Sequence, residues 1–235
     1  MKKLATLAFF LFISSMIHAQ ESSVQNTPGS VTSRGYLGVT IGPAFAVGDY
    51  ADDDAASNEN ASYAKTGINY SVDFGYRLGK RWGITASYRG GSNAIDEEAF
   101  AETLQDIGLG SPTVDADPYK YNAIMVGPML SWGSSRFDFD LRLELGYGFG
   151  TLPEININNV YNQMDFSTES EKASGVGVLF GGGLRYHLSS KLSFLAQLNY
   201  FSMVLSPDDD SATGEEIEQP IDVVTIDLGI ALRLK

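Results

Sequence analysis

Residues of alternating polarity recur along most of this chain, and this period of two constrains its fold more than any other feature. Between Phe137 and Gly150, seven apolar residues alternate strictly with acidic residues, one arginine and glycines. Successive side chains of a β-strand point to opposite faces of the sheet, so the pattern predicts a strand with one apolar and one polar face. Such a run is longer than a half-buried strand of a soluble domain usually needs.

Eight segments of this kind follow one another, and an even number of antiparallel strands can close without a free edge. After the N-terminal segment, no stretch approaches the roughly 18 uninterrupted apolar residues of a membrane-spanning helix. A mature chain that crosses a membrane must therefore do so as a barrel. The predicted fold class is all-β, an eight-stranded antiparallel up-and-down transmembrane β-barrel. Its predicted strands are 37–47, 68–78, 84–89, 119–132, 137–150, 176–187, 192–200 and 222–235.

The connections between these segments alternate in length, and their acidic residues are concentrated in the long ones. The long connections hold 22 of the 29 acidic residues of the chain. Short periplasmic turns and long extracellular loops are typical of outer-membrane barrels, so the acidic loops are predicted to lie outside the cell. The short turns are 79–82, 133–136 and 189–191, and the long loops are 49–65, 91–118, 153–172 and 206–220.

The N-terminal residues have the pattern of a secretory signal peptide. Lys2 and Lys3 precede an apolar run, and the small residue Ala19 ends it. We expect a signal peptide at 1–19, cleavage near Ala19, a flexible periplasmic lead at 20–33 and a barrel domain at 34–235. The predicted location is the outer membrane of a Gram-negative bacterium. The chain has no cysteine, so it forms no disulfide.

The net charge restricts the possible partners. It is −13 for the whole chain and becomes −15 when the leader, with its two lysines, is removed. Phosphates repel such a chain, which argues against a nucleic-acid partner. The expected partners are outer-membrane lipids and lipopolysaccharide, and the barrel-assembly machinery during insertion; a surface ligand is not identified.

The second face of the strands distinguishes a membrane barrel from a soluble lipocalin-like barrel, which keeps its apolar face inward. Here charged residues are mixed with many glycines, as expected for a narrow interior in which small residues leave room for long ones. Trp82 and Trp132 lie beside short turns, where an interfacial aromatic girdle would place them. The predicted interior polar network consists of Asp73, Arg77, Arg89, Asp138, Asp140, Arg142, Glu144, Arg185, Asp227 and Arg233.

Several of these segments resemble a known family. The hairpin YRLGKRWGITASYR, the segment VGPMLSW, the strand LELGYGFG and the closing IDLGIALRLK are similar to the outer-membrane protein β-barrel domain family of small Gram-negative envelope proteins. The resemblance covers about residues 34–235. Its motifs are alternation patterns, so it implies a fold and a location rather than an activity.

Motifs for catalysis or metal binding are sparse. The glycine clusters lie inside predicted strands without a following helix, unlike phosphate loops. His187 is the one histidine beyond the leader and is predicted to point inward near a periplasmic turn, so we predict no enzyme activity and no cofactor. In loop 91–118, Asn93 is predicted to cap a helix over Ala94 to Ile107. Weak candidates for cation ligands are Asp52, Asp53, Asp54, Asp208, Asp209 and Asp210.

The sequence favours a non-enzymatic outer-membrane barrel that has a structural role or presents its acidic loops to surface ligands. A narrow, porin-like solute channel is the first alternative, although the interior of an eight-stranded barrel is normally filled by side chains. A membrane-embedded lipid-modifying enzyme is a weaker alternative, because pairs of nucleophile and base are few.

Overall fold

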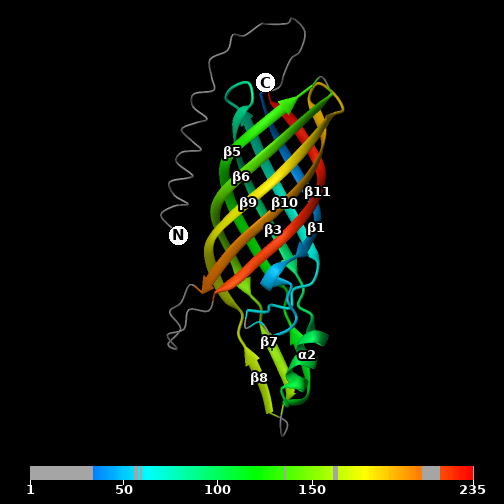
Figure 1. Cartoon of the computed structure of the whole chain (residues 1–235), viewed down its shortest axis with the longest axis vertical. Coiled ribbons are helices and arrows are strands. Elements are labelled where there is room, and N and C mark those ends of the chain that lie inside the picture. Colours follow the sequence, from blue (N-terminus) through cyan, green and yellow to red (C-terminus); the bar gives the residue numbers. More distant parts are fainter. Residues whose placement is uncertain are drawn as a thin grey trace, which may run out of the picture. The chain divides into compact units, whose positions relative to one another are not determined.

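The structure is a computed structural model that describes residues 34–55, 58, 60–134, 136–160, 164–207 and 218–234. The predicted signal peptide (1–19), the predicted periplasmic lead (20–33) and the acidic run at 208–210 lie outside these residues. Eight strands close into an antiparallel barrel in the order β1-β11-β10-β9-β6-β5-β3-β2, as predicted (Figure 1). The barrel strands are β1 (Gly35–Ala46), β2 (Gly67–Arg77), β3 (Trp82–Asn93), β5 (Tyr119–Gly133), β6 (Phe137–Leu152), β9 (Glu171–His187), β10 (Leu192–Pro207) and β11 (Gln219–Leu234).

The first and last strands complete the barrel by pairing with each other. Leu37 of β1 lies opposite Leu232 of β11 on one side and opposite Phe74 of β2 on the other. Consecutive strands pair around the rest of the wall, so the sheet has no free edge. Among the described residues, no helix has the length and apolarity needed to cross a membrane.

The outer wall of the barrel is apolar along its length. The residues predicted to face outward do so, including Ile41 on β1, Leu145 on β6 and Leu228 on β11. Near the short turns, Trp132 packs against Phe139 and Phe137 against Tyr186, with ring centroids 5.9 and 5.1 Å apart. An exposed belt of large apolar side chains on a closed sheet is suited to lipid, not to water.

Several strands extend further than the alternation predicts at the end that bears the long connections. β9 begins at Glu171, β10 continues to Pro207 and β11 begins at Gln219. Within the extension of β10, apolar residues occupy both faces of the strand, in the sequence from Tyr200 to Leu205. The period of two is lost there, so the sequence pattern predicts an end of β10 that is too early.

The described residues of three long connections, 49–65, 91–118 and 153–172, fold into a separate layer beyond the barrel, which we call the head. Its elements are η2 (Gly48–Tyr50), α2 (Glu97–Asp106) and a three-stranded sheet in the order β4-β7-β8, seen at the lower end of Figure 1. Two loops build this sheet, because β4 belongs to 91–118 whereas β7 and β8 belong to 153–172. The sheet strands are β4 (Gly110–Ala116), β7 (Ile155–Val160) and β8 (Met164–Thr168).

The predicted loop helix exists, but its predicted start was wrong. Asp96, not Asn93, is the N-cap, and its side chain accepts a hydrogen bond from the Ala99 N–H. Asn93 is the last residue of β3 and is buried. Its side-chain amide donates to the carbonyls of Ala44 and Lys65, at 3.1 and 2.7 Å, and so joins β3 to the barrel rim.

Candidate functional site: the barrel interior and its two ends

The middle of the barrel is crossed by an ion-pair network centred on Arg142 of β6. Its guanidinium lies 2.6 Å from the Asp73 carboxylate on β2 and 3.9 Å from that of Glu144. It also donates to the side-chain carbonyls of Gln197 and Asn199 on β10, at 2.7 Å each. These side chains are buried, so Arg142 links three separate strands across the lumen.

Two central carboxylates, those of Glu144 and Asp227, accept hydrogen bonds from neutral donors. Glu144 accepts from the hydroxyls of Thr85 and Ser87, at 2.9 and 2.5 Å. Asp227 accepts from the amides of Asn69 and Asn199, each at 3.0 Å, and forms no ion pair with an arginine that the structure describes. Buried carboxylates persist when their oxygens are hydrogen-bonded, and these contacts satisfy that requirement.

Inward-facing glycines make room for this network. A Cβ atom at Gly181 would lie 2.2 Å from Asn199 Oδ1, and one at Gly75 would lie 2.3 Å from Cε1 of Tyr36. Neither position can accept a side chain without displacing its neighbour. The inward-facing glycines therefore leave the space in which long polar and aromatic side chains cross the lumen.

Arg89 of β3 belongs to the predicted interior network but forms no ion pair with any residue that the structure describes. The side chain is completely buried, and none of its three nitrogens has a hydrogen-bond partner among the described residues. Its guanidinium carbon lies 5.2 Å from the ring centroid of Phe201. Arg89 thus marks the boundary between the charged middle of the lumen and an apolar layer.

This apolar layer corrects the expectation that the whole interior is polar. In the half of the barrel next to the head, the inward positions of β10 and β11 carry large apolar side chains, and β9 contributes one. Phe201 stacks on Tyr121 of β5 with ring centroids 5.8 Å apart. Other buried members are Met125, Leu179, Met203, Leu205, Ile221 and Val223.

The head covers the end of the barrel next to this layer. Tyr50 of η2 is buried within the same cluster and makes an edge contact with Tyr119, with ring centroids 5.3 Å apart. Burial raises the pKa of the Tyr50 phenol well above its usual value, the neighbouring phenols adding to the effect. The Tyr119 hydroxyl donates to the Ser62 carbonyl, and the Gln219 amide donates to the Ser62 hydroxyl. Ser62 therefore joins the first long loop to β5 and β11.

Tyr63 fixes the first long loop to the helix. Its φ of 54° lies in the left-handed region, which is unusual for an aromatic residue. The ring stacks on Phe100 of α2 with centroids 4.9 Å apart, and the hydroxyl donates to Thr103 Oγ1 at 3.1 Å. These contacts with the helix hold a strained backbone in place, so the head is a packed structure.

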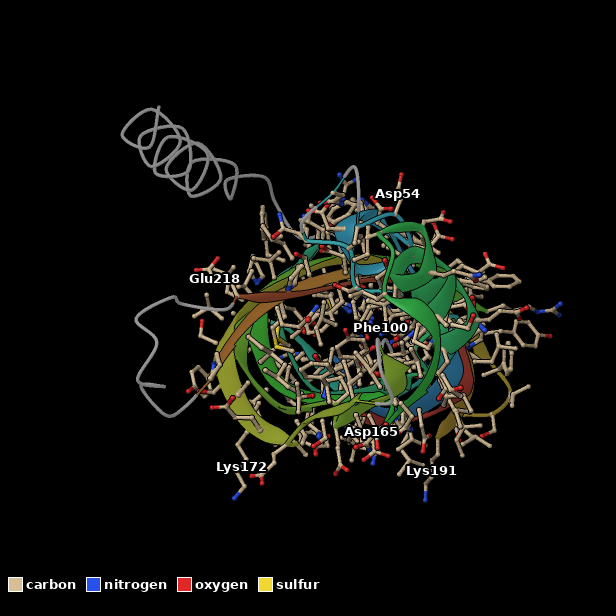
Figure 2. The ribbon with its side chains drawn as sticks, turned by 90° about the horizontal axis from the view of Figure 1, so that it is seen from below. Asp54, Phe100, Asp165, Lys172, Lys191 and Glu218 are labelled. Atoms are coloured by element: carbon tan, nitrogen blue, oxygen red, sulfur yellow. The ribbon has the colours of Figure 1, made fainter. Side chains whose placement is uncertain are left out.

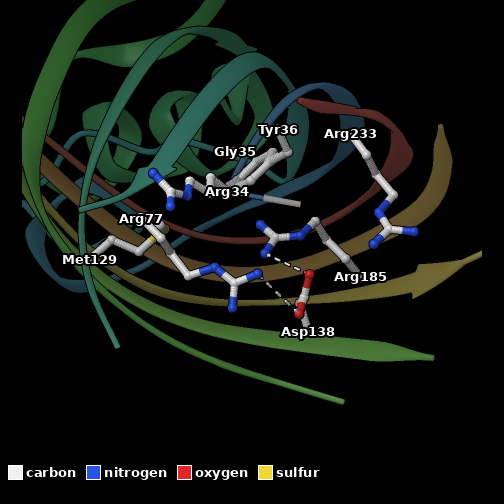
Figure 3. Close-up of a pocket in the computed structure, with 8 residues that line it drawn as sticks. All are labelled: Arg34, Gly35, Tyr36, Arg77, Met129, Asp138, Arg185 and Arg233. Carbon is white, nitrogen blue, oxygen red and sulfur yellow. Dashed lines mark ion pairs between the residues drawn. The ribbon is translucent and has the colours of Figure 1, made fainter. Parts of the chain in front are cut away.

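The opposite end of the lumen, beside the short turns, is lined by charged side chains (Figure 3). Arg185 binds Asp140 through two nitrogens and lies 3.4 Å from Asp138, which is also 3.7 Å from Arg77. The Arg185 guanidinium stacks over the ring of Tyr36 at 3.9 Å. Arg233, predicted to join the acids, instead donates to the Ser189 carbonyl at 3.2 Å.

His187 lies between a hydroxyl and a carboxylate at this end. Its Nδ1 is 3.0 Å from Ser193 Oγ, and its Nε2 is 3.4 Å from Asp138. The combination matches the residue types of a hydrolase triad. Ser193, however, has an exposure of 0 % and cannot be reached by a substrate, and Asp138 already serves two arginines. The arrangement is therefore suited to holding the interior together.

Among the weak metal candidates in the first long loop, the Asp52 carboxylate is engaged with other groups of the loop. Asp52 accepts hydrogen bonds from the Asn58 amide and the Asp54 N–H, which lower the pKa of its carboxyl. Asn58 also donates to Asp49. Within the described part of the chain, no group of three or more His, Cys, Asp or Glu side chains is placed to hold a metal ion.

The sequence pattern identified the polar positions of the lumen but missed three features of its closure: the apolar layer, Tyr50 and the Ser62–Tyr63 junction. A signal for the layer was present in the apolar residues on both faces between Tyr200 and Leu205. No local pattern pointed to Ser62 or Tyr63, because their partners lie far away in the sequence.

A closed eight-stranded barrel with an apolar outer wall and a filled lumen defines a transmembrane barrel of the outer-membrane type. A family model agrees with this class: the outer membrane protein beta-barrel domain matches residues 5–230. The chain belongs to this family. No curated protein sequence matches it.

Solved structures of outer-membrane proteins are similar to the chain at low sequence identity. The attachment invasion locus protein Ail of Yersinia pestis is 18% identical, with a TM-score of 0.43, and the match covers 86% of this chain and 99% of that one. Neisserial surface protein A is 12% identical with a TM-score of 0.44, covering 86% and 98%. A major outer membrane protein of Thermus thermophilus is 14% identical with a TM-score of 0.47, covering 85% and 99%.

Proposed function

We propose that this protein is a sealed, non-enzymatic outer-membrane barrel whose function is to hold a folded acidic head at the cell surface. The observation that carries the proposal is the filled lumen. Arg142 and its partners fill the middle of the lumen, and the apolar layer together with Tyr50 fills the end next to the head. An interior filled in this way anchors a rigid structure and leaves no continuous path for solutes.

The surface of the head supports a role in binding. Exposed carboxylates lie on every part of it, and Figure 2 shows Asp54, Asp165 and Glu218 projecting from three different loops. Lys65, Lys120 and Lys172 are the described basic residues at this end. The ligand that such a surface fits is cationic, either a basic protein segment or divalent cations that bridge to the phosphates of lipopolysaccharide.

The proposed function requires that the chain is exported and inserted into the outer membrane. We infer that the leader is removed near Ala19, that the barrel-assembly machinery inserts the chain, and that the short turns face the periplasm. The lengths of the connections support this orientation, because outer-membrane barrels have short periplasmic turns and long extracellular loops.

Conductance of the purified barrel in a planar lipid bilayer tests the sealed lumen. We expect no stable ohmic openings. Replacing Tyr50 and Phe201 together by alanine should leave the closed state intact, because the Arg142 network still blocks the middle. Reproducible openings of the unmodified protein that disappear on substitution of Arg142 would establish the solute channel and overturn the proposal.

A further inference from the structure

Basic side chains collect at the end of the barrel opposite the head. In the described part of this end, the acidic side chains are Asp138 and Asp140. This end of the barrel is therefore positively charged, although the chain as a whole is acidic. The proposed function gives this positive charge no role. The basic residues at this end are Arg34, Arg77, Lys80, Arg81, Arg136, Arg185, Lys191 and Arg233.

Four of these arginines surround a small pocket at the mouth of the lumen (Figure 3). Its volume is about 10 Å³, and Asp138 is the one carboxylate in its lining. The other lining residues are Gly35, Tyr36 and Met129. The pocket therefore combines four fixed positive charges with a single negative charge.

The ion pairs at this mouth leave two of the arginines unmatched. Arg185 forms ion pairs with Asp140 and Asp138, and Arg77 forms an ion pair with Asp138. Neither Arg34 nor Arg233 forms an ion pair with any residue that the structure describes. The Nε atom of Arg233 is buried and has no hydrogen-bond partner there either.

We propose that this mouth binds an oxyanion, a carboxylate or phosphate group presented from the periplasmic side. Guanidinium groups offer paired N–H donors that match the two oxygens of such a group. A space of about 10 Å³ is close to the size of one water molecule, so one oxygen enters while the rest of the ligand stays outside.

The direction of the pocket distinguishes the ligand from a membrane lipid. Arg185 and Tyr36 point into the lumen from the inner faces of β9 and β1, where both are buried. The pocket they line thus opens along the barrel axis and not through the lipid-facing wall. A soluble or polymer-borne anion of the periplasm reaches it, whereas a headgroup of the surrounding bilayer does not.

Binding is tested by titrating the full-length folded protein in detergent with inorganic phosphate, and separately with acetate, by calorimetry. Trp82 and Trp132, at the same end, provide a second readout through their fluorescence. We expect Arg34→Gln and Arg233→Gln each to weaken binding about tenfold or more, the effect of losing one charge-assisted hydrogen bond. The double variant should show no binding.

Lys120→Gln and Lys172→Gln are matched controls, because each removes one exposed positive charge at the far end of the same barrel. Their affinity should equal that of the unmodified protein, and all variants should keep the heat-modifiable band of a folded barrel. Binding of phosphate alone would assign a phosphate ligand, and binding of acetate would assign a carboxylate. Failure of both anions to bind, or an equal loss in the lysine controls, would overturn the proposal whatever the conductance experiment shows.

Discussion

Arg142 is the residue on which the central network depends. Arg142→Ala leaves Asp73 and Glu144 buried without their positive partner, and removal of one member of a buried pair typically destabilises by about 3–5 kcal/mol. We expect the free energy of unfolding to fall by that amount, read as a lower urea midpoint of the heat-modifiable folded band. A silent substitution, together with a stabilising Asp73→Leu, would contradict the network.

Arg89 should respond with the opposite sign. Its guanidinium is buried without a hydrogen bond, and an unsatisfied buried polar group costs about 1–3 kcal/mol. Arg89→Met keeps the unbranched apolar part of the side chain while removing the guanidinium and its charge. We therefore expect the urea midpoint to rise. A fall comparable to that of Arg142→Ala would show that Arg89 is paired in the membrane.

These two arginines show what a sequence can predict at the scale of one residue. The period of two placed both inside the barrel, and both are inside. It did not distinguish them, because the partners of an inward side chain are set by the register of strands several steps around the wall. Arg142 meets carboxylates on β2 and β6, whereas Arg89 meets an aromatic ring on β10.

At the scale of elements, α2 is held to the first long loop by a titratable contact. Asp96 caps the helix and lies 3.0 Å from Lys65. Partial burial opposes its ionisation, but the hydrogen bonds from Lys65 and the Ala99 N–H outweigh this and lower the pKa of the Asp96 carboxyl. The stability from this contact is therefore present above the unfolded pKa of about 3.9 and is lost as the pH falls through the lower folded value.

Asp96→Asn should remove this pH dependence while retaining a cap. We expect amide exchange of α2 to become faster in the unmodified protein as the pH falls below about 4, after correction for the intrinsic pH dependence of exchange. The variant should lack this additional change. The side chains of Lys65 and Asp96 are 51% and 30% exposed, so the salt bridge itself contributes at most about 1 kcal/mol. Identical profiles for the two proteins would rule out Asp96 as the titrating group.

The elements that the sequence predicted well are those with two unlike faces. The wall of β6 follows its alternation throughout, because one face meets lipid and the other meets charged side chains. The sheet β4-β7-β8 escaped prediction, since its strands are short and pair across two loops. The end of β10 escaped because apolar residues line both faces there.

At the scale of the whole molecule, charge divides along the barrel axis, with an acidic head at one end and a basic mouth at the other. A membrane-impermeant amine reagent added to intact cells should label Lys120 and Lys172, which are exposed beside the head, and should spare Lys80 and Lys191 in the short turns. Peptide mass spectrometry locates the labels. Preferential labelling of Lys80 and Lys191 would show that the barrel is inserted in the opposite direction.

The lumen network also determines when the folding chain can satisfy its charges. Arg142 and Asp73 are 69 residues apart, and the hydrogen bond from Asn69 to Asp227 joins positions 158 residues apart. Such contacts form only when the sheet has curved round and β1 approaches β11. Non-local pairings of this kind slow folding, because the entropy of closing the loops is lost before the contacts form. The step that closes the barrel is therefore also the step that neutralises its interior, so a partly closed sheet remains a charged, high-energy intermediate.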